Sequence, residues 1–286
     1  MRRYFKKRRF QPFRLSLNSF LLGLVVISIA PFFTPLAIAG DSIAGESAED
    51  NKWKYNVELF ASPGDERDLT GFDILFPLWQ NTSSIAFMDF RATRSSEDTT
   101  EFSLGTGYRK FKADFIYGAN LFYDTRTTSV NNRFNQITVG FEVLSIDWDF
   151  RFNIYTPASD SESVDSDEPA DQFFGRRIYI AGVREEVLEG FDIEVGYLMK
   201  ALKWETRVFL AGYTLSGDHD ETADGARLSF EVRPQKNVSL SLNYQNDSLF
   251  DSQLRGELRY SFAYPHTKEL RQLRERMLET SRRDVD

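Results

Sequence analysis

Residues 148 to 155, WDFRFNIY, alternate between apolar and polar side chains. The apolar set is Trp148, Phe150, Phe152 and Ile154, and the polar set is Asp149, Arg151 and Asn153. Successive side chains of an extended chain point to opposite faces, so this stretch predicts a β-strand with one apolar and one polar face. In a soluble sheet the apolar face meets a protein interior, and in a membrane barrel it meets lipid. Other parts of the sequence distinguish the two.

Runs of the same kind recur between Trp53 and Tyr264, with no helical window among them. Thirteen can be delimited: 53–61, 69–79, 83–93, 99–109, 113–124, 134–144, 146–155, 173–184, 190–199, 203–213, 225–233, 236–246 and 251–264. Single-chain bacterial barrels close with an even number of strands. The run 173–184 alternates least, and removing it also places the long connections on one side. The sequence therefore predicts twelve strands, with both ends periplasmic and the long loops outside.

The polar faces and the run ends favour a membrane over a secreted β-sandwich. Acidic and basic residues share the hidden face, and we expect these to line a lumen: Asp147, Asp149, Arg151, Arg227, Glu231, Arg233, Arg255, Glu257 and Arg259. Aromatic residues recur near run ends, as in an interfacial girdle: Trp79, Tyr108, Tyr123, Trp148, Tyr155, Trp204, Tyr213 and Tyr264. Run lengths approach the ~9–11 residues of a tilted membrane strand. The predicted fold is all-β, a transmembrane up-and-down antiparallel β-barrel over residues 53–264.

The charged lining admits two interpretations. An unpaired ion in a medium of low dielectric constant is costly, so these charges must be paired or hydrated. They would either hold a tail or a passing chain, or form a network that is satisfied across neighbouring strands.

The first 39 residues predict a signal peptide. Seven Arg and Lys residues without an acidic residue precede an apolar run over 20–30 and a small-x-small ending at Ala39. That run is shorter than the ~20 residues of a spanning helix, which disfavours the alternative of an uncleaved anchor. Cleavage would leave 28 basic and 43 acidic residues, a net charge of −15, which argues against nucleic acid as a partner. Residues 40–52 would form a short periplasmic lead-in.

Residues 265–286 predict a short C-terminal helical tail. Pro265 separates it from the last strand, and Leu270, Leu273 and Met277 have helical spacing on a heavily charged segment. A frayed helix in water is the plainer interpretation. The alternative is a tail that lies in or below the pore.

Seven stretches occur in an order that is more specific than any one of them. They are FDILFPLWQNTSSIAFMDFRA (72–92), EFSLGTGYRKF (101–111), YGANLFYDT (117–125), NNRFNQITVGFEV (131–143), FNIYTP (152–157), EGFDIEVGYL (189–198) and LNYQND (242–247). In this order they resemble the translocator barrel of the intimin/invasin family, the inverse autotransporters, over roughly residues 53–286. The resemblance implies an outer-membrane barrel of a Gram-negative-type bacterium, through which a C-terminal passenger of adhesive domains threads outward and leaves its linker inside.

The resemblance also implies partners: outer-membrane lipid, the barrel assembly machinery and periplasmic chaperones. No Ig-like repeats follow the barrel in this sequence, so we expect export or surface display, linked to adhesion only through the family. A separately encoded passenger and an unidentified host surface ligand stay open as partners. A passenger-less pore or structural barrel is the alternative function.

The last predicted strand carries a second pattern. In RGELRYSF (255–262), Gly256, Leu258, Tyr260 and Phe262 resemble the terminal-strand signal that the barrel assembly machinery reads, which would act by pairing along the strand edge. The alternative is an ordinary lipid-facing strand.

The sequence contains no motif for catalysis or metal binding. The only histidines, His219 and His266, have no motif partner, and no Gly-x-Ser-x-Gly elbow, metal-ligand cluster or cysteine is present. We therefore expect no enzyme and no cofactor. The six carboxylates of 156–171 could take calcium, but they lack the spacing of an EF-hand loop, which favours a solvated loop. Glycines within the strands indicate bends or close packing: Gly105, Gly107, Gly118, Gly140 and Gly196.

Overall fold

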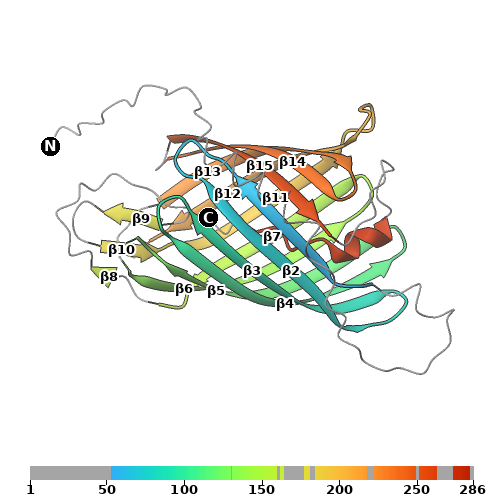
Figure 1. Cartoon of the computed structure of the whole chain (residues 1–286), viewed down its shortest axis with the longest axis horizontal. Helices are drawn as coiled ribbons and strands as arrows, with labels where there is room; N and C mark the ends of the chain where they lie inside the picture. The colour runs from blue at the N-terminus through green and yellow to red at the C-terminus, as the bar shows by residue number, and fades with distance from the viewer. Residues whose placement is uncertain are drawn as a thin grey trace.

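The computed structural model describes residues 53–129, 131–159, 162–163, 177–180, 184–217, 222–248, 251–262 and 273–283. In these residues twelve strands form a closed antiparallel barrel (Figure 1). They are β1 (Asn56–Ser62), β2 (Leu69–Gln80), β3 (Ser84–Ser95), β4 (Thr100–Lys112), β5 (Phe115–Thr127), β6 (Arg133–Leu144), β7 (Trp148–Pro157), β11 (Glu189–Leu198), β12 (Glu205–Ser216), β13 (Thr222–Gln235), β14 (Val238–Asp247) and β15 (Asp251–Ser261). The predicted twelve-strand barrel is confirmed. The predicted signal peptide and lead-in lie outside the described residues.

Strands that are neighbours in the barrel are also consecutive in the chain, with two exceptions. β7 pairs with β11, and β15 closes the barrel on β1. The closing pair runs from Glu58 opposite Ser261 to Ala61 opposite Leu258. Beyond it, the Gly256 N–H donates to the Pro63 carbonyl at 2.9 Å. The edges of the sheet are therefore paired with each other, which leaves no free edge in the closed barrel.

The described residues of the removed run 173–184, 177–180 and 184, lie outside the barrel, as predicted. Part of it forms β9 (Arg177–Ile180), which pairs with β10 (Arg184–Val187) in a three-stranded sheet completed by β8 (Glu162–Ser163). Buried Glu185 of β10 accepts hydrogen bonds from Thr128 Oγ1 at 3.0 Å and Asn132 Nδ2 at 2.9 Å. These bonds join the small sheet to the connection between β5 and β6.

The connections divide the barrel into two ends. The tight-turn end has the connections 81–83, 113–114, 145–147, 199–204 and 236–237. At the long-loop end are 63–68, 96–99 and the strand ends from which the chain leaves β5 for β6 and β7 for β11, among others. β2 to β6 have 12 or 13 residues each. At ~3.3 Å per residue and a tilt of about 45° such strands rise about 28 Å, which matches the thickness of a membrane. No helix among the described residues is long and apolar enough to cross a bilayer.

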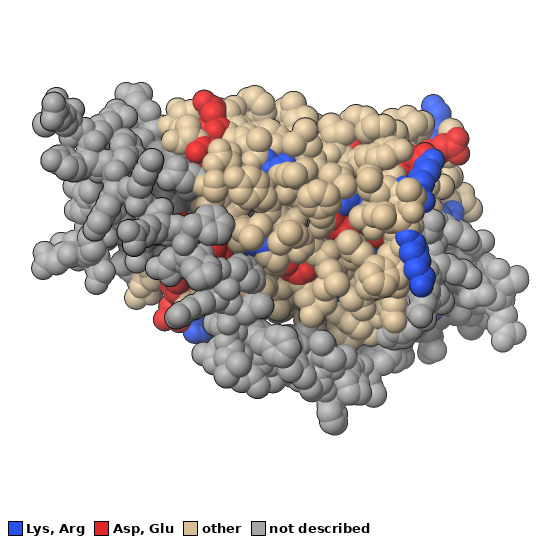
Figure 2. Space-filling model, turned by 90° about the horizontal axis from the view of Figure 1, so that it is seen from above, with Lys and Arg blue, Asp and Glu red and all other residues tan. Residues whose placement is uncertain are grey.

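The outside of the barrel is apolar and its inside is charged. In β7, Trp148 and Phe150 are 46% and 47% exposed, whereas Asp149 is 0% and Arg151 is 7% exposed. The side of the molecule in Figure 2 shows mostly uncharged residues along its middle. An exposed apolar band around a closed barrel is the surface that meets lipid. The predicted girdle is partly wrong: Tyr155 and Tyr213 are buried inside, where their hydroxyls donate to Asp192 and Asp247, and Tyr264 lies outside the described residues.

Two glycines of β4 make room for inward aromatic rings. A Cβ at Gly105 would lie 2.1 Å from Cδ1 of Phe122, and one at Gly107 would lie 2.4 Å from Cζ of Phe87. Both rings are buried inside the barrel, at 1% and 0% exposure. A side chain at either position would overlap a ring that has little space to move, which is the close packing predicted for glycines inside these strands.

We expect Gly105→Val to destabilise the folded barrel by about 1–3 kcal/mol or more, because the added methyl groups would displace the ring of Phe122. Urea unfolding of the refolded protein in micelles measures this, with heat-modifiable electrophoretic mobility as the index of folding. Leu104→Val is the matched control, since Leu104 is 50% exposed on the outer face of the same strand. Equal unfolding midpoints for the two variants would contradict the prediction.

Candidate functional site

The C-terminal segment 273–283 lies inside the barrel (Figure 1). It begins with a 3-10 helix, η3 (Leu273–Leu278), at the tight-turn end. The buried side chains of η3 pack against the apolar lining of this end, in one cluster: Trp53, Leu75, Ile85, Phe87, Ile116, Leu144, Leu273, Met277 and Leu278. The expectation of a frayed helix in water is therefore wrong for these residues. Leu270 lies outside the described residues.

The backbone of η3 is held by side chains of the wall. The Trp53 indole N–H donates to the Arg274 carbonyl at 3.0 Å, and Asn56 Nδ2 donates to the Leu278 carbonyl at 3.0 Å. Arg109 of β4 donates through one nitrogen to the carbonyls of Met277 and Glu279. The last carbonyls of a helix have no partner within it, and here the barrel wall supplies the missing donors.

Arg276 forms the central ion pair between the tail and the wall. Its Nη1 lies 2.7 Å from Oδ1 of Asp149, and its Nη2 lies 2.8 Å from Oδ2 of the same carboxylate. Asp149 also accepts from Arg207 at 3.3 Å and from Arg151 at 3.2 Å. Arg276 is 2% exposed and Asp149 is 0% exposed. A bidentate guanidinium–carboxylate pair fixes the orientation of the guanidinium group as well as neutralising its charge. This pair therefore determines the orientation of the tail in the lumen.

Beyond η3 the tail continues without regular secondary structure toward the long-loop end. The Ser281 N–H donates to Asp89 of β3 at 3.3 Å. Arg282 contacts Glu231 of β13 at 3.2 Å and Glu194 of β11 at 3.4 Å. Arg283 pairs with Asp124 of β5 at 2.6 Å and lies over the Phe122 ring, 3.7 Å from its centroid. Four strands, β3, β5, β11 and β13, thus hold the three consecutive tail residues 281–283.

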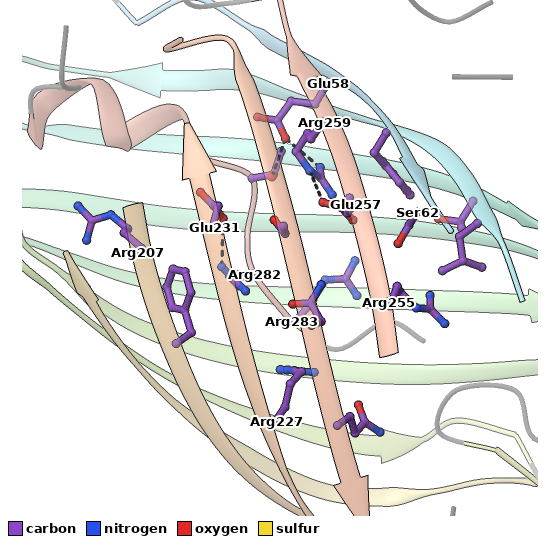
Figure 3. Close-up of a pocket in the computed structure, with 18 of the residues that line it drawn as sticks. Glu58, Ser62, Arg207, Arg227, Glu231, Arg255, Glu257, Arg259, Arg282 and Arg283 are labelled. Carbon is purple, nitrogen blue, oxygen red and sulfur yellow. Dashed lines mark hydrogen bonds and ion pairs between the residues drawn. The ribbon is translucent and has the colours of Figure 1, made fainter. Parts of the chain in front are cut away.

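Eight of the nine predicted lumen residues line a single cavity of about 250 Å³ beside this tail (Figure 3). They are Asp149, Arg151, Arg227, Glu231, Arg233, Arg255, Glu257 and Arg259. Asp147 differs from the expectation. It lies in the turn between β6 and β7, is one-third exposed, and pairs with exposed Lys200 at 2.6 Å. The inward alternation ends with β7, and the turn carries Asp147 to the rim.

The seam between β15 and β1 carries its own ionic cluster. Arg259 of β15 pairs with Glu58 of β1 at 2.9 Å, with Asp73 of β2 at 2.5 Å and with Glu257 at 3.1 Å (Figure 3). The tail joins this cluster, because Thr280 Oγ1 donates to Glu58 at 3.1 Å. The charges on this part of the lining are paired, partly within the wall and partly with the tail, so both interpretations of the charged lining apply.

The residues of the predicted assembly signal lie on β15 and just after it. Leu258 is paired with Ala61 of β1 and Leu240 of β14, and Tyr260 with Leu59 and Val238. The rings of Tyr260 and Phe262 lie 4.9 Å apart. Gly256 is bonded to β1 through the Ser62 hydroxyl, which donates to its carbonyl at 2.9 Å. Their role in assembly stays a prediction.

Several residues that hold the tail were missed in the sequence. They are Arg109, Asp124, Glu142 and Glu194 in the wall and Arg276, Arg282 and Arg283 in the tail. The wall residues lie on the polar faces of predicted strands, so the same alternation could have found them. Arg276, Arg282 and Arg283 had no such signal, because the sequence pattern of a short charged helix is the same whether the helix lies in water or in a polar lumen. Among the described residues, no group of three or more His, Asp or Glu could hold a metal ion.

The fold and the site together define a class: a transmembrane β-barrel whose lumen contains its own C-terminal segment. Residues 52–285 match the family described as inverse autotransporter, beta-domain. The chain belongs to this family, which is a barrel-domain family and not a known enzyme family.

Comparison with solved structures finds similar chains. The one described as "Unveiling the Mechanism Behind the in-meso Crystallization of Membrane Proteins" has 17% sequence identity and a TM-score of 0.67, over 81% of this chain and 97% of that chain. The KdgM porin has 10% identity and a TM-score of 0.47, over 72% and 99%. The beta domain of the Bordetella autotransporter BrkA has 9% identity and a TM-score of 0.35, over 72% and 98%. Comparison with curated proteins gives no match.

Proposed function

We propose that this barrel exports or displays polypeptide that follows its C-terminal segment, and that the segment 273–283 is the linker held in the lumen. The observation that carries the proposal is the direction of the tail. It enters at the tight-turn end through η3 and reaches Asp124, near the long-loop end of β5, with Arg283. A chain that enters on one side and points to the other follows the path that an outward-threaded passenger would take.

The contacts along this path suit a linker that is held in place. Ion pairs at Arg276, Arg282 and Arg283 anchor it at three positions along the segment, and the apolar cluster around Met277 closes the tight-turn end. In this proposal the tight-turn end faces the periplasm. The link to adhesion comes from the family alone, and depends on a passenger beyond the barrel or one encoded separately.

A tag fused after Asp286 tests the proposal. We expect protease added to intact cells to remove the tag, because the tail would deliver the fused segment to the outer surface. Matched controls are the same tag in the turn 81–83 at the tight-turn end, which should stay protected, and in the loop 96–99 at the long-loop end, which should be cut. A tag after Asp286 that is cut only in permeabilised cells would overturn outward threading.

The second candidate function is a passenger-less pore. The cavity of about 250 Å³ beside the tail favours it, since part of the lumen is not filled by protein. In this case ions would pass through the intact barrel with the tail in place.

A further inference from the structure

Lysine is confined to one end of this barrel. Every lysine in the part of the chain that the structure describes lies at the tight-turn end, on a strand end, in a turn or just before β1: Lys54, Lys110, Lys112, Lys200, Lys203 and Lys236. The arginines, in contrast, contribute most of the positive charge of the lumen. Most lysines and the lumen arginines therefore occupy different environments, and the lysines outside the lumen need an explanation other than the tail.

Five of these lysines are exposed, and we call Lys54, Lys110, Lys112, Lys200 and Lys203 the lysine rim. The sixth, Lys236, is buried and pairs with Glu275 of the tail at 3.0 Å. In Figure 2, Lys and Arg side chains gather at one end of the molecule, beyond the uncharged middle. The lysine rim therefore forms a basic belt outside the lumen.

The lysine rim lies beside exposed aromatic side chains. Lys110 is opposite Tyr117 of β5 and Lys112 is opposite Phe115, and both rings are at least 40% exposed. Lys203 directly precedes Trp204, which is 51% exposed. Exposed aromatic rings at the ends of barrel strands mark the level of the lipid headgroups. A lysine at this level can lay its alkyl stem on apolar surface and extend its ammonium group to a phosphate.

Little acidic charge opposes the lysine rim. Asp114 and Asp147 are the acidic residues of the described tight turns, and Asp147 pairs with Lys200. This hydrogen bond raises the pKa of Lys200, so that lysine stays charged. Lys54, Lys110, Lys112 and Lys203 have no ion pair within the described residues. Acidic side chains instead collect in the described loops of the other end: Asp65, Glu66, Asp68, Glu97 and Asp98.

We propose that the lysine rim binds the anionic headgroups of phospholipids in the leaflet that meets the tight-turn end of the barrel. Clustered lysines beside a membrane surface attract anionic lipid and have little preference for zwitterionic lipid. The rim surrounds the mouth through which the tail enters, so bound headgroups would fix the depth of this mouth in the bilayer. The proposal does not depend on whether a passenger is exported.

Three native tryptophans report on this surface. Trp79, Trp148 and Trp204 are 53%, 46% and 51% exposed, and all lie at the tight-turn end, whereas Trp53 is buried in the lumen. The mature chain would be refolded into phosphatidylcholine vesicles that contain phosphatidylglycerol, with bromine on the acyl chains of one lipid or the other. We expect brominated phosphatidylglycerol to quench the fluorescence about two- to fivefold more per lipid than brominated phosphatidylcholine. Salt at 0.5 M should weaken the difference, because it screens exposed charges.

The variant K54Q/K110Q/K112Q/K203Q should lose the difference and quench equally with both lipids. The matched control is R94Q/R133Q, which removes two exposed arginines from the long-loop end and should behave as the wild type. Heat-modifiable mobility verifies that each variant is folded. Equal quenching in the wild type, or a difference that survives in the lysine variant, would overturn the proposal. So would lysine-dependent retention on isolated peptidoglycan without any lipid preference, since the rim would then face the cell wall.

Discussion

Deletion of residues 265–286 should convert a barrel with low conductance into an open channel. In the intact chain, η3 and its apolar partners fill the tight-turn end, and Arg282 and Arg283 cross the middle of the lumen. Without them a twelve-strand barrel has an interior wider than its own side chains can fill, so the single-channel conductance should rise on the order of tenfold or more. Planar-bilayer recording of the refolded mature chain with and without this segment measures the change.

The control for this deletion uses the tail itself. A synthetic peptide of residues 265–286, added from the tight-turn side, should reduce the conductance of the deleted barrel, whereas a peptide with Arg276 and Arg283 changed to Gln should reduce it less. The passenger-less pore gives a different result, because the intact chain would then conduct as well as the deleted one. Recording therefore separates the two candidate functions without any assumption about a passenger.

Asp149→Asn should have the largest effect of any single substitution in the lumen. The change leaves the guanidinium groups of Arg276, Arg207 and Arg151 close together without the carboxylate that all three contact. Loss of one partner from a buried ionic cluster typically costs about 3–5 kcal/mol, so the free energy of unfolding in urea should fall by about this amount. The tail should also dock less well, with a higher conductance as the second measurement.

Asp98→Asn is the matched control. Asp98 also pairs with an arginine, Arg94, at 3.0 Å, but the side chains are 82% and 69% exposed. An exposed pair contributes little, so this variant should differ from the wild type by less than about 1 kcal/mol. The double variant Asp149→Asn/Arg276→Gln should be less destabilised than the sum of its single variants, because the two residues share one interaction. If Asp149→Asn and Asp98→Asn unfold at the same urea concentration, the ion pair does not hold the tail.

The order of the seven motifs correctly indicated the family through its resemblance to known barrels. The alternation of apolar and polar residues by itself indicated most of the strands of the barrel wall. In β7 the alternation of Trp148 with Asp149 fixes which side chain meets lipid and which meets the lumen, because a strand has only two faces. The weak alternation of 173–184 likewise separated β9 from the barrel. Errors occurred where a strand ends or a side chain is amphipathic. Asp147 lies in a turn, and Tyr155 and Tyr213 use a hydroxyl to join the polar interior.

The sequence by itself thus determined the strands and the surface that meets lipid, because both depend on side chains two residues apart. The lengths of the connections and the even number of strands in such barrels then set the count at twelve. Only the tertiary structure decided where the tail lies. Arg276 meets Asp149 across 127 residues of chain, and Trp53 meets Arg274 across 221. A helix of six residues has too little stability of its own to specify its position. Its place is set by the walls of a lumen that exists only when all twelve strands have closed.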